Sequence, residues 1–365
     1  MKFITTATEF KNALGKVDRV TDKKNQLPVL GFVLIKAEKD TVTLKGTNLD
    51  IGIEYKIRAK VVTEGECAIS GAVVISFLSA LREEKLEVNL VGGSLSFVVG
   101  PHTVMVKTSP HDDFPNLPQV YSKKVITLSI DDFIEATRLV SYAGSISTIK
   151  PEITSVYFYT NEKDIFFVAT DSFRLAEKKI TSPEMYENIS AIIPLKNIHE
   201  IIKTFEGVVG DVLITISENQ ISFKTDSFYI TSRLINGVYP NYRQIVPTKF
   251  KTEVSIKTSQ FISTLRSLLV FTDKVNQLNI QIVPEKSVIE LSVKNNDLGE
   301  GVTVLPATIS GEGITFTCNL KYLLDAFMSI TEENTSIRLN EHNKPFIMQG
   351  SGNQKFLYLV MPMNR

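Results

Sequence analysis

Three segments decide the fold: TEFKNALGKV (8–17), DDFIEATRLV (131–140) and SQFISTLRSL (259–268). From the phenylalanine onward, each carries apolar or small side chains at the spacing 0, 3, 4, 7, which is one face of an amphipathic helix. The phenylalanines are Phe10, Phe133 and Phe261, and they lie 123 and 128 residues apart. A helix returning at this interval predicts one unit of roughly 120 residues that is repeated three times.

A second helix is predicted in each repeat, because the same spacing begins again at Val74, Ile198 and Leu320. These stripes continue through Phe77, Leu78 and Leu81, through Ile201, Ile202 and Phe205, and through Leu323, Leu324 and Phe327. Side-chain caps are predicted for the first helices: Thr6 with Glu9, Ser129 with Asp132, and Thr258 or Ser259.

Strand patterns fill the remainder of each repeat. Alternating apolar residues with a polar turn predict hairpins at 42–57, 164–180 and 288–305, and again at 94–109, 220–235 and 345–361. Two helices and several antiparallel strands per repeat predict an α+β fold with helices packed on sheets. Polar, proline-marked segments at 118–124 and 247–252 place the boundaries, giving repeats of 1–121, 122–248 and 249–365.

The charge balance limits how the protein can bind nucleic acid. The 365 residues hold 40 Lys plus Arg and 40 Asp plus Glu, so the formal net charge is zero. Neutrality argues against a tight grip through many phosphate contacts, but it leaves a topological association open. No apolar run reaches the roughly 20 residues that span a bilayer, and the first residues lack a signal-peptide pattern, so we expect a cytoplasmic protein with no membrane partner.

No catalytic, cofactor or metal site is predicted. The phosphate-binding loop, the dinucleotide fingerprint and the nucleophile elbow are all missing. The pairs Asp112-Asp113 and Asp131-Asp132 are interpreted as turn and cap residues, and Cys67 and Cys318 as buried reduced thiols. Three hypotheses remain: a DNA-tethered binding protein, a non-catalytic repeat scaffold without a DNA role, and an enzyme with an unrecognised site.

Four segments are more specific than the helix and strand patterns: DDFPNLP (112–118), ATDSFRLA (169–176), YPNYRQIVP (239–247) and VMPMNR (360–365). With LPVLGFVLIKA (27–37), which looks like a strand of the first repeat, they resemble the bacterial sliding clamps, the β subunits of the replicative DNA polymerase. The resemblance covers the whole chain. It implies three DNA-clamp domains, a homodimeric ring of six domains, and a non-catalytic processivity factor that encircles duplex DNA without sequence specificity.

The resemblance also implies a hydrophobic cleft that binds short peptides of the polymerase, the clamp loader and repair proteins. The matching positions are Ile153, Thr170, Ser172, Phe173, Arg174, Leu175, Pro240, Gln244, Ile245, Leu359, Val360, Met361, Pro362 and Met363. Flexible methionines suit a surface that accepts several partners. The chain departs from the family's pattern at Ser172-Phe173, where Gly-His is usual, at Gln244, where Arg is common, and at Asn364, which follows the last methionine.

Two further surfaces are implied. Basic residues on the helices and nearby loops would face the duplex, with Lys24, Arg82, Arg138, Lys196, Lys203 and Arg266 as the main candidates, and Lys11 and Arg19 beside them. The dimer contact would join the first repeat of one chain to the third repeat of the other, through Val104 and Val106 on a strand and Leu269 and Val270 at a helix end.

Overall fold

The computed structural model describes residues 1–22, 24, 26–82, 85–147 and 149–363. These residues group into two compact units. Unit 1 comprises Met1–Ile134 and Lys196–Asn236, and unit 2 comprises Glu135–Leu195 and Gly237–Arg365. The division falls within the helices α3 (Ile130–Ser141) and α4 (Leu195–Phe205), so the second of the three repeats contributes to both units.

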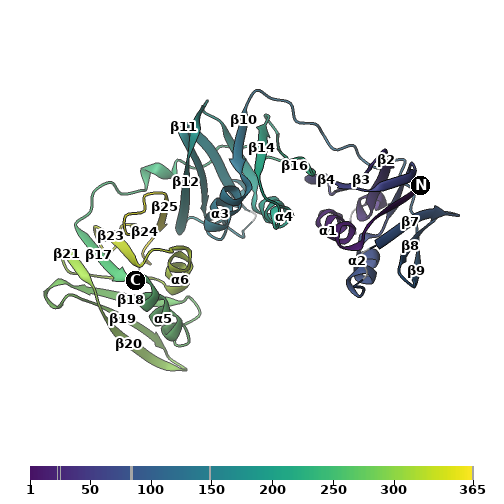
Figure 1. Ribbon diagram of the computed structural model, residues 1–365. Helices are drawn as coiled ribbons and strands as arrows, with labels where there is room; N and C mark the ends of the chain where they lie inside the picture. The colour runs from purple at the N-terminus through teal and green to yellow at the C-terminus, as the bar shows by residue number, and fades with distance from the viewer. Residues whose placement is uncertain (23, 25, 83–84, 148, 364–365) are drawn as a thin grey trace. The chain divides into compact units, whose positions relative to one another are not determined.

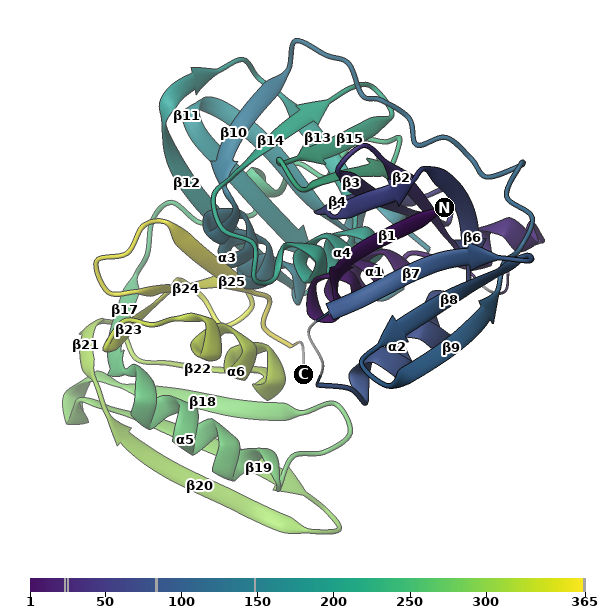
Figure 2. The same cartoon turned by 45° about the vertical axis from the view of Figure 1, so that its right-hand side comes forward.

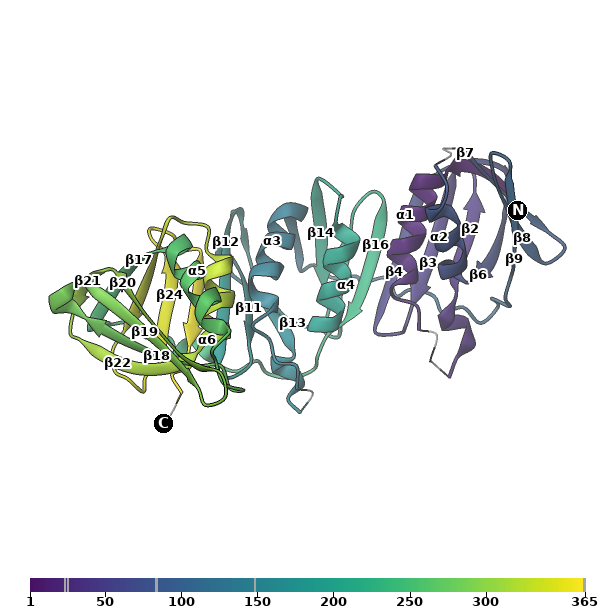
Figure 3. The same cartoon turned by 90° about the horizontal axis from the view of Figure 1, so that it is seen from below.

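Six α-helices occur in the described residues, and they are the six that the sequence predicts. Besides α3 and α4 they are α1 (Ala7–Asp18), α2 (Gly71–Ser79), α5 (Thr258–Leu269) and α6 (Leu320–Ser329). The three phenylalanines that open the stripes are fully buried. Helices α1 and α2 pack against each other in unit 1, as do α5 and α6 in unit 2 (Figure 3).

Two predictions about the second helices and the caps were wrong. Helix α2 ends at Ser79, so Leu81 lies outside it. Helix α5 has no side-chain cap, and its N-cap residue is Lys257. The helix begins at Thr258 itself, so this hydroxyl lies inside the first turn, where it donates to the carbonyl of Glu332 at 2.7 Å. The predicted caps at Thr6 and Ser129 are confirmed by bonds from the amides of Glu9 and Asp132, at 3.2 and 3.4 Å.

Unit 1 contains two antiparallel sheets. The first has the strand order β5-β1-β7-β8-β9, with β7, β8 and β9 side by side in Figure 2. The second has the order β10-β14-β15-β16-β4-β3-β2-β6. The bounds are β1 Lys2–Thr6, β2 Val33–Glu38, β3 Thr41–Thr47, β4 Ile51–Arg58, β5 Lys60–Thr63, β6 Gly65–Ile69, β7 Lys85–Val91, β8 Ser94–Val99, β9 His102–Lys107, β10 Val125–Ser129, β14 Asp211–Ile216, β15 Gln220–Lys224 and β16 Phe228–Arg233.

Unit 2 contains two more antiparallel sheets, with orders β13-β11-β12-β25-β24-β23-β17-β21 and β20-β19-β18-β22. The bounds are β11 Ser155–Thr170, β12 Arg174–Tyr186, β13 Ser190–Pro194, β17 Thr252–Lys257, β18 Gln277–Val283, β19 Val288–Asn295, β20 Gly299–Pro306, β21 Thr308–Gly311, β22 Ile314–Asn319, β23 Asn334–Leu339, β24 Phe346–Gly350 and β25 Phe356–Val360. Figure 1 shows α6 beside β25. All six predicted hairpins are confirmed.

The segment 27–37 is only partly a strand. Strand β2 begins at Val33, and Pro28–Gly31 form a 3-10 turn, η1. Proline fixes φ near −65° and has no amide to donate, so the chain turns before the strand can begin. None of the helices among the described residues is both long enough and apolar enough to span a lipid bilayer.

Consecutive repeats are joined strand to strand. In unit 1, β16 of the second repeat pairs with β4 of the first, with Ser232 opposite Ile51. In unit 2, β25 of the third repeat pairs with β12 of the second, with Val360 opposite Arg174. We call these the first and second junctions. At each, the last strand of one repeat extends the hairpin of the repeat before it.

Candidate functional site

The residues predicted to bind partner peptides lie in unit 2 around the second junction, and we call this set the partner surface. Pairing of β12 with β25 sets Leu175 opposite Leu359. Beyond the end of β25, the Met361 amide donates to the Phe173 carbonyl at 2.8 Å, so the C-terminal tail lies along the β11–β12 turn. The tail then reaches β22, where the Met363 amide donates to the Thr317 carbonyl at 2.8 Å.

The turn between β11 and β12 is held by its own side chains. The Thr170 hydroxyl donates to the Arg174 carbonyl at 2.6 Å and accepts from the Ser172 amide at 3.2 Å. The Asp171 carboxylate accepts from the amides of Phe173 and Arg174, both at 2.9 Å. These bonds hold Ser172 at φ +78°, a left-handed conformation that glycine adopts without strain. The turn leaves the Phe173 side chain 61% exposed.

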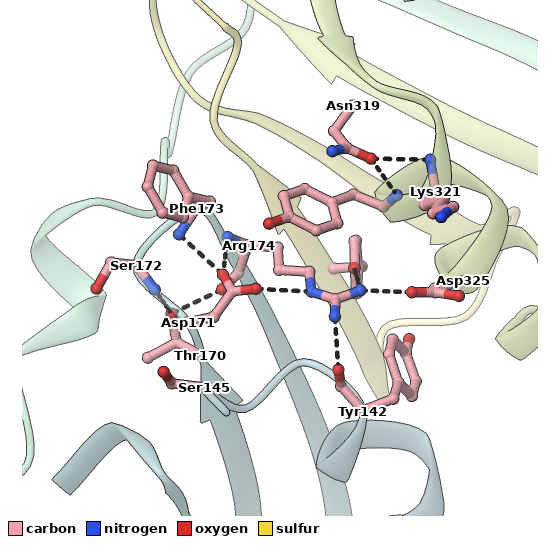
Figure 4. A network of polar contacts seen from close by, with 12 residues as sticks. Tyr142, Ser145, Thr170, Asp171, Ser172, Phe173, Arg174, Asn319, Lys321 and Asp325 are labelled. Carbon is pink, nitrogen blue, oxygen red and sulfur yellow. Dashed lines mark hydrogen bonds and ion pairs between the residues drawn. The ribbon is translucent and has the colours of Figure 1, made fainter. Parts of the chain in front are cut away.

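Arg174 ties this turn to two helices (Figure 4). Its Nε lies 3.0 Å from the Asp171 carboxylate, and its Nη1 lies 2.5 Å from the Asp325 carboxylate of α6. Its Nη2 donates to the Tyr142 carbonyl at 2.7 Å, just past the end of α3. The guanidinium also lies 4.4 Å from the ring centroid of Tyr322. Because one planar group satisfies acceptors from three segments, Arg174 fixes the turn relative to α3 and α6.

The environment of Arg174 keeps it charged. Burial opposes the charge, but attraction and hydrogen bonds from Tyr358, Asp325 and Asp171 outweigh it, and the pKa of the guanidinium is raised above its ordinary value. The side chain is 12% exposed. Breaking such a pair by removing one partner leaves a poorly solvated charge on the other, which is costly.

The linker that leads into the third repeat is docked on the second repeat by aromatic rings. Tyr239 stacks on Tyr157, with centroids 4.5 Å apart and planes 8° apart. The Tyr242 hydroxyl shares a 2.7 Å bond with the Tyr159 hydroxyl and also bonds the Glu177 carboxylate. Burial raises the pKa of Tyr242, with Glu177 adding to the effect, so the phenol stays protonated and can donate to this carboxylate.

We call these contacts of Tyr239 and Tyr242 with the second repeat the aromatic seam. Arg243 adds further contacts to it. Its guanidinium lies 5.0 Å from the Phe166 centroid, donates to the Tyr159 hydroxyl at 2.5 Å and approaches Glu177 to 3.5 Å. The next residues, Gln244 and Ile245, belong to the partner surface, so the seam fixes their position. The sequence prediction missed the seam. The signal was the run of tyrosines and phenylalanine in β11, facing the two tyrosines of the linker.

Buried phenols make the stability of unit 2 dependent on pH in the alkaline range. Burial raises the pKa of Tyr142, Tyr239, Tyr242 and Tyr358 above the ordinary value of 10.0. Above pH 10 the unfolded chain therefore loses these protons before the folded chain does, and stability falls as pH rises. We expect little change between pH 8 and 9 and a loss that approaches about 1.4 kcal/mol per pH unit for each phenol above pH 10, measured by chemical denaturation between pH 8 and 11.

Tyr239→Phe provides the matched variant for this pH series. The Tyr239 hydroxyl is buried without a hydrogen-bond partner among the described residues. We expect Tyr239→Phe to raise the free energy of unfolding at pH 8 by about 1 kcal/mol and to remove one phenol's share of the alkaline slope. An unchanged slope in Tyr239→Phe would contradict this account.

The partner surface has a buried base and an exposed apolar rim. Leu175, Leu359 and Val360 are at most 1% exposed, so they support the surface from beneath. Phe173 and Ile245, at 61% and 47%, project from it, and Met361–Met363 are half-buried. Asn364 lies outside the described residues. Ser145 lies near Thr170 in Figure 4, and Ile146, which follows it in the chain, and Ile149 are 99% and 86% exposed.

The six main basic candidates are all exposed, and they come from both units. Lys196 is paired with Asp50 at 2.5 Å and Lys203 with Glu200 at 2.9 Å. Arg266 approaches the Met328 sulfur at 3.8 Å. Lys24 lies in a turn after α1, Arg82 follows α2, and Arg138 lies in α3. These six side chains place positive charge at several exposed positions, and two of them are in ion pairs.

Lys203 also lines a cavity of about 470 Å³ in unit 1, together with Lys11, Lys16 and Arg19. The Lys16 ammonium donates to the carbonyls of Thr204 and Glu206 at the end of α4, at 2.7 and 3.0 Å. Burial lowers the pKa of Lys16, the charge of Arg19 lowers it further, and Glu206 opposes the effect. Four basic side chains and the carboxylate of Glu206 therefore line the same cavity.

The residues predicted for the dimer contact lie at sheet and helix ends. Val104 and Val106 are half-buried on β9, which is an edge strand of its sheet in the described residues. Leu269 ends α5, and Val270 after it is 67% exposed.

The described residues contain no cluster of metal-ligand side chains, and their two cysteines are buried. No group of three His, Cys, Asp or Glu side chains there is placed to hold a metal ion. Both cysteines are buried, and burial raises the pKa of the Cys67 thiol to about 12. A thiol with a raised pKa is a poor nucleophile near neutral pH.

Comparison with known proteins places the chain in a family. Three family models match consecutive segments: the N-terminal domain of the DNA polymerase III beta subunit over residues 1–118, the central domain over 127–241 and the C-terminal domain over 243–364. The beta sliding clamp of Synechococcus elongatus is 28% identical over 375 residues, covering 100% of this chain and 99% of that protein. That of Staphylococcus aureus is 25% identical with the same coverage.

Solved structures show the same fold. The sliding clamp of Bacillus subtilis matches with a TM-score of 0.94 at 23% identity, covering 100% of this chain and 99% of that one. A clamp of Pseudomonas aeruginosa bound to griselimycin matches with a TM-score of 0.95 at 20% identity, covering both chains fully. The chain has three DNA-clamp domains, and it belongs to the family of DNA polymerase III β subunits, the sliding clamps.

Proposed function

We propose that this protein is a DNA polymerase processivity factor that closes around duplex DNA as a homodimeric ring. Members of this family are non-catalytic accessory subunits, so the chain is not an enzyme. The observation that carries the proposal is the full-length match to all three clamp domains in order. We place the protein in the cytoplasm, associated with the nucleoid where its DNA lies, and its domain boundaries at 1–121, 122–248 and 249–365.

The two junctions within the chain suggest how the ring closes. At each, the last strand of one repeat pairs with the second strand of a hairpin in the repeat before it. By the same rule, β9, the last strand of the first repeat, would pair with β20, the second strand of the β19–β20 hairpin in the third repeat. Both strands lie at the edges of their sheets. Pairing β9 with β20 of a second copy would repeat the junction twice and close a ring of two chains. Val302 and Val304 on β20, 59% and 53% exposed, support this.

The basic residues fit loose contact with the DNA backbone. A ring holds DNA topologically, so a neutral chain with dispersed cations can slide without many strong phosphate contacts. We propose that Lys24, Arg82, Arg138, Lys196, Lys203 and Arg266 face the duplex, and that the cavity lined by Lys11, Lys16 and Arg19 adds to this surface. No base-reading element is proposed, so binding is independent of sequence.

We propose that the partner surface binds short peptides of the polymerase, the clamp loader and repair proteins. Its exposed Phe173 and Ile245, the half-buried methionines of the tail and the fixed linker provide apolar contacts on a prearranged base. A prearranged surface loses less conformational entropy when a peptide binds. Phe173 and Gln244 alter the rim, so the preferred peptide sequence is expected to differ from the family's usual one.

Retention on closed and open DNA tests the ring. The protein is loaded by a clamp loader onto nicked circular DNA, and the bound fraction is compared before and after the circle is cut. We expect the circle to retain the protein and the linear product to release it, because a ring slides off a free end. A scaffold protein without a DNA role would not be retained by either, and equal retention by both would rule out topological binding.

Replacing Met361 and Met363 together with alanine tests the partner surface. The two side chains offer deformable apolar contacts, so we expect affinity for a peptide from the replicative polymerase to fall at least tenfold. Fluorescence anisotropy measures the affinity. Met185→Ala, at a methionine 70% exposed on β12, is the control and should leave affinity unchanged. Retention on circular DNA should be unaffected in both variants, whereas unchanged affinity in the double variant would contradict the assignment.

A further inference from the structure

The first junction repeats the turn that shapes the partner surface. The Thr47 hydroxyl donates to the Ile51 carbonyl at 2.9 Å and accepts from the Leu49 amide at 3.0 Å. The Asn48 side chain accepts from the amides of Asp50 and Ile51, both at 3.0 Å. Leu49 has φ +74°, close to the +78° of Ser172. Residues 47–51 therefore correspond one by one to residues 170–174.

The linkers of the two junctions correspond as well. The first contains Phe-Pro-Asn-Leu (114–117) where the second contains Tyr-Pro-Asn-Tyr (239–242). Leu117 is 8% exposed and Tyr242 is 6% exposed, so both linkers are docked by their fourth residue. A Cβ on Gly52 would lie 2.3 Å from the Leu117 side chain, so the docked leucine occupies the space that this glycine leaves.

The strand ends provide the third correspondence. The Arg233 amide donates to the Asp50 carbonyl at 2.8 Å, as the Met361 amide donates to the Phe173 carbonyl. The segment after β16 thus leaves the first junction where the C-terminal tail leaves the second. The turn, the linker and the strand end of the partner surface therefore each have a counterpart in unit 1, with different side chains.

These counterparts enclose a cavity of about 240 Å³. Its lining includes Leu49, Asp50, Leu117, Gln220, Thr231 and Arg233. Leu117 and Thr231 are 8% and 4% exposed and belong to the deeper part, while Asp50, Gln220 and Arg233 lie nearer solvent. A small, partly apolar floor with a polar rim suits one or two side chains of an extended peptide.

The rim charges define the peptide. Asp50 is paired with Lys196 at 2.5 Å, so its charge is balanced. Arg233 is exposed, and no described residue forms an ion pair with its guanidinium. An arginine in this position is a bidentate partner for a carboxylate.

We propose that the first junction holds a second peptide site, which takes a short extended segment of a partner protein bearing an acidic side chain. Arg233 binds the carboxylate, and the neighbouring side chain enters the cavity whose deeper part is lined by Leu117 and Thr231. This proposal rests on the proposed function, since the partner surface is the precedent for its geometry. It gives each chain two unlike sites, one for apolar peptides and one for acidic peptides.

The test uses a display library of random short peptides as the probe. The library is selected against the full-length protein carrying Met361→Ala and Met363→Ala, which weakens the partner surface. We expect enriched peptides to contain Asp or Glu and to lose about tenfold in affinity when Arg233→Glu is added, because a charge-assisted bond is lost. Arg233→Lys keeps the charge but not the bidentate geometry, so it should lose less affinity than Arg233→Glu. Absence of enriched peptides, or affinity indifferent to Arg233→Glu, would overturn the proposal.

Two controls separate this proposal from the proposed function. Lys224→Glu reverses an exposed charge on neighbouring β15 and should leave the selected peptides bound. In the protein with both methionines intact, Arg233→Glu should leave the polymerase peptide bound with unchanged affinity. If the affinity for the polymerase peptide does not depend on Met361 and Met363, only the partner surface is contradicted. If the affinity for the selected peptides does not depend on Arg233, only the second site is contradicted.

Discussion

Replacing Arg174 with alanine is expected to lower the free energy of unfolding by about 3–5 kcal/mol. The substitution removes a guanidinium that joins the β11–β12 turn to α3 and α6, and it leaves Asp171, 15% exposed, without its ion-pair partner. Chemical denaturation followed by circular dichroism measures the change. We also expect affinity for a polymerase peptide to fall about tenfold or more, because the turn that presents Phe173 loses its anchor.

Graded variants separate the causes of this loss. Arg174→Lys keeps the charge, but one ammonium cannot reach Asp171, Asp325 and the Tyr142 carbonyl together, so about 1–2 kcal/mol should be lost. Arg266→Ala removes an exposed arginine of α5 in the same unit and should change stability by less than about 0.5 kcal/mol. A loss below about 1 kcal/mol for Arg174→Ala would show that the network contributes little to the junction.

The sequence was sufficient for the helices because their signal is local. Phe10, Phe133 and Phe261 open stripes that complete within eight residues, and each stripe is buried as predicted. Hairpins were equally accessible, since alternation and turn residues are adjacent in the chain. The cap of α5 was wrong because the helix begins at Thr258, which places the N-cap at Lys257, and the Thr258 hydroxyl bonds Glu332, 74 residues along the chain.

The sites were less accessible for the same reason. Family resemblance pointed to Arg174, but its partner Asp325 is 151 residues away, and no periodicity connects the two. The aromatic seam likewise joins Tyr159 to Tyr242 across 83 residues. The correspondence between the two junctions was hidden because the turns share a hydrogen-bond pattern with only partial sequence identity, Thr47-Asn48 against Thr170-Asp171. Long-range polar contacts are set by the fold, so they appear only once the strands are paired.

Edge strand β9 provides the sharpest test of ring closure, because its backbone has a defined orientation. The Thr108 amide, just past the end of the strand, donates to the Gly93 carbonyl at 3.1 Å, in register with the pairing of β8 and β9. Amides alternate in direction along an antiparallel strand, so those of Val104 and Val106 point toward β8, and that of Met105 points away from it. The Met105 amide is therefore directed at the free edge, where a strand of a second chain would pair.

Met105→Pro is expected to convert the dimer to a monomer without unfolding the chain. Proline has no amide to donate and its ring blocks an approaching strand, yet an edge position tolerates it when the missing amide faces outward. Met105 is 60% exposed, so the change leaves the core intact. We expect the dimer dissociation constant, measured by analytical ultracentrifugation, to rise on the order of 100-fold, and retention on circular DNA to be lost.

Met105→Thr is the control, because it replaces the long side chain but keeps the backbone amide, so this variant should remain dimeric. A dimeric Met105→Pro protein that is still retained on circles would exclude β9 from the contact and, with it, closure of the ring through β9 and β20.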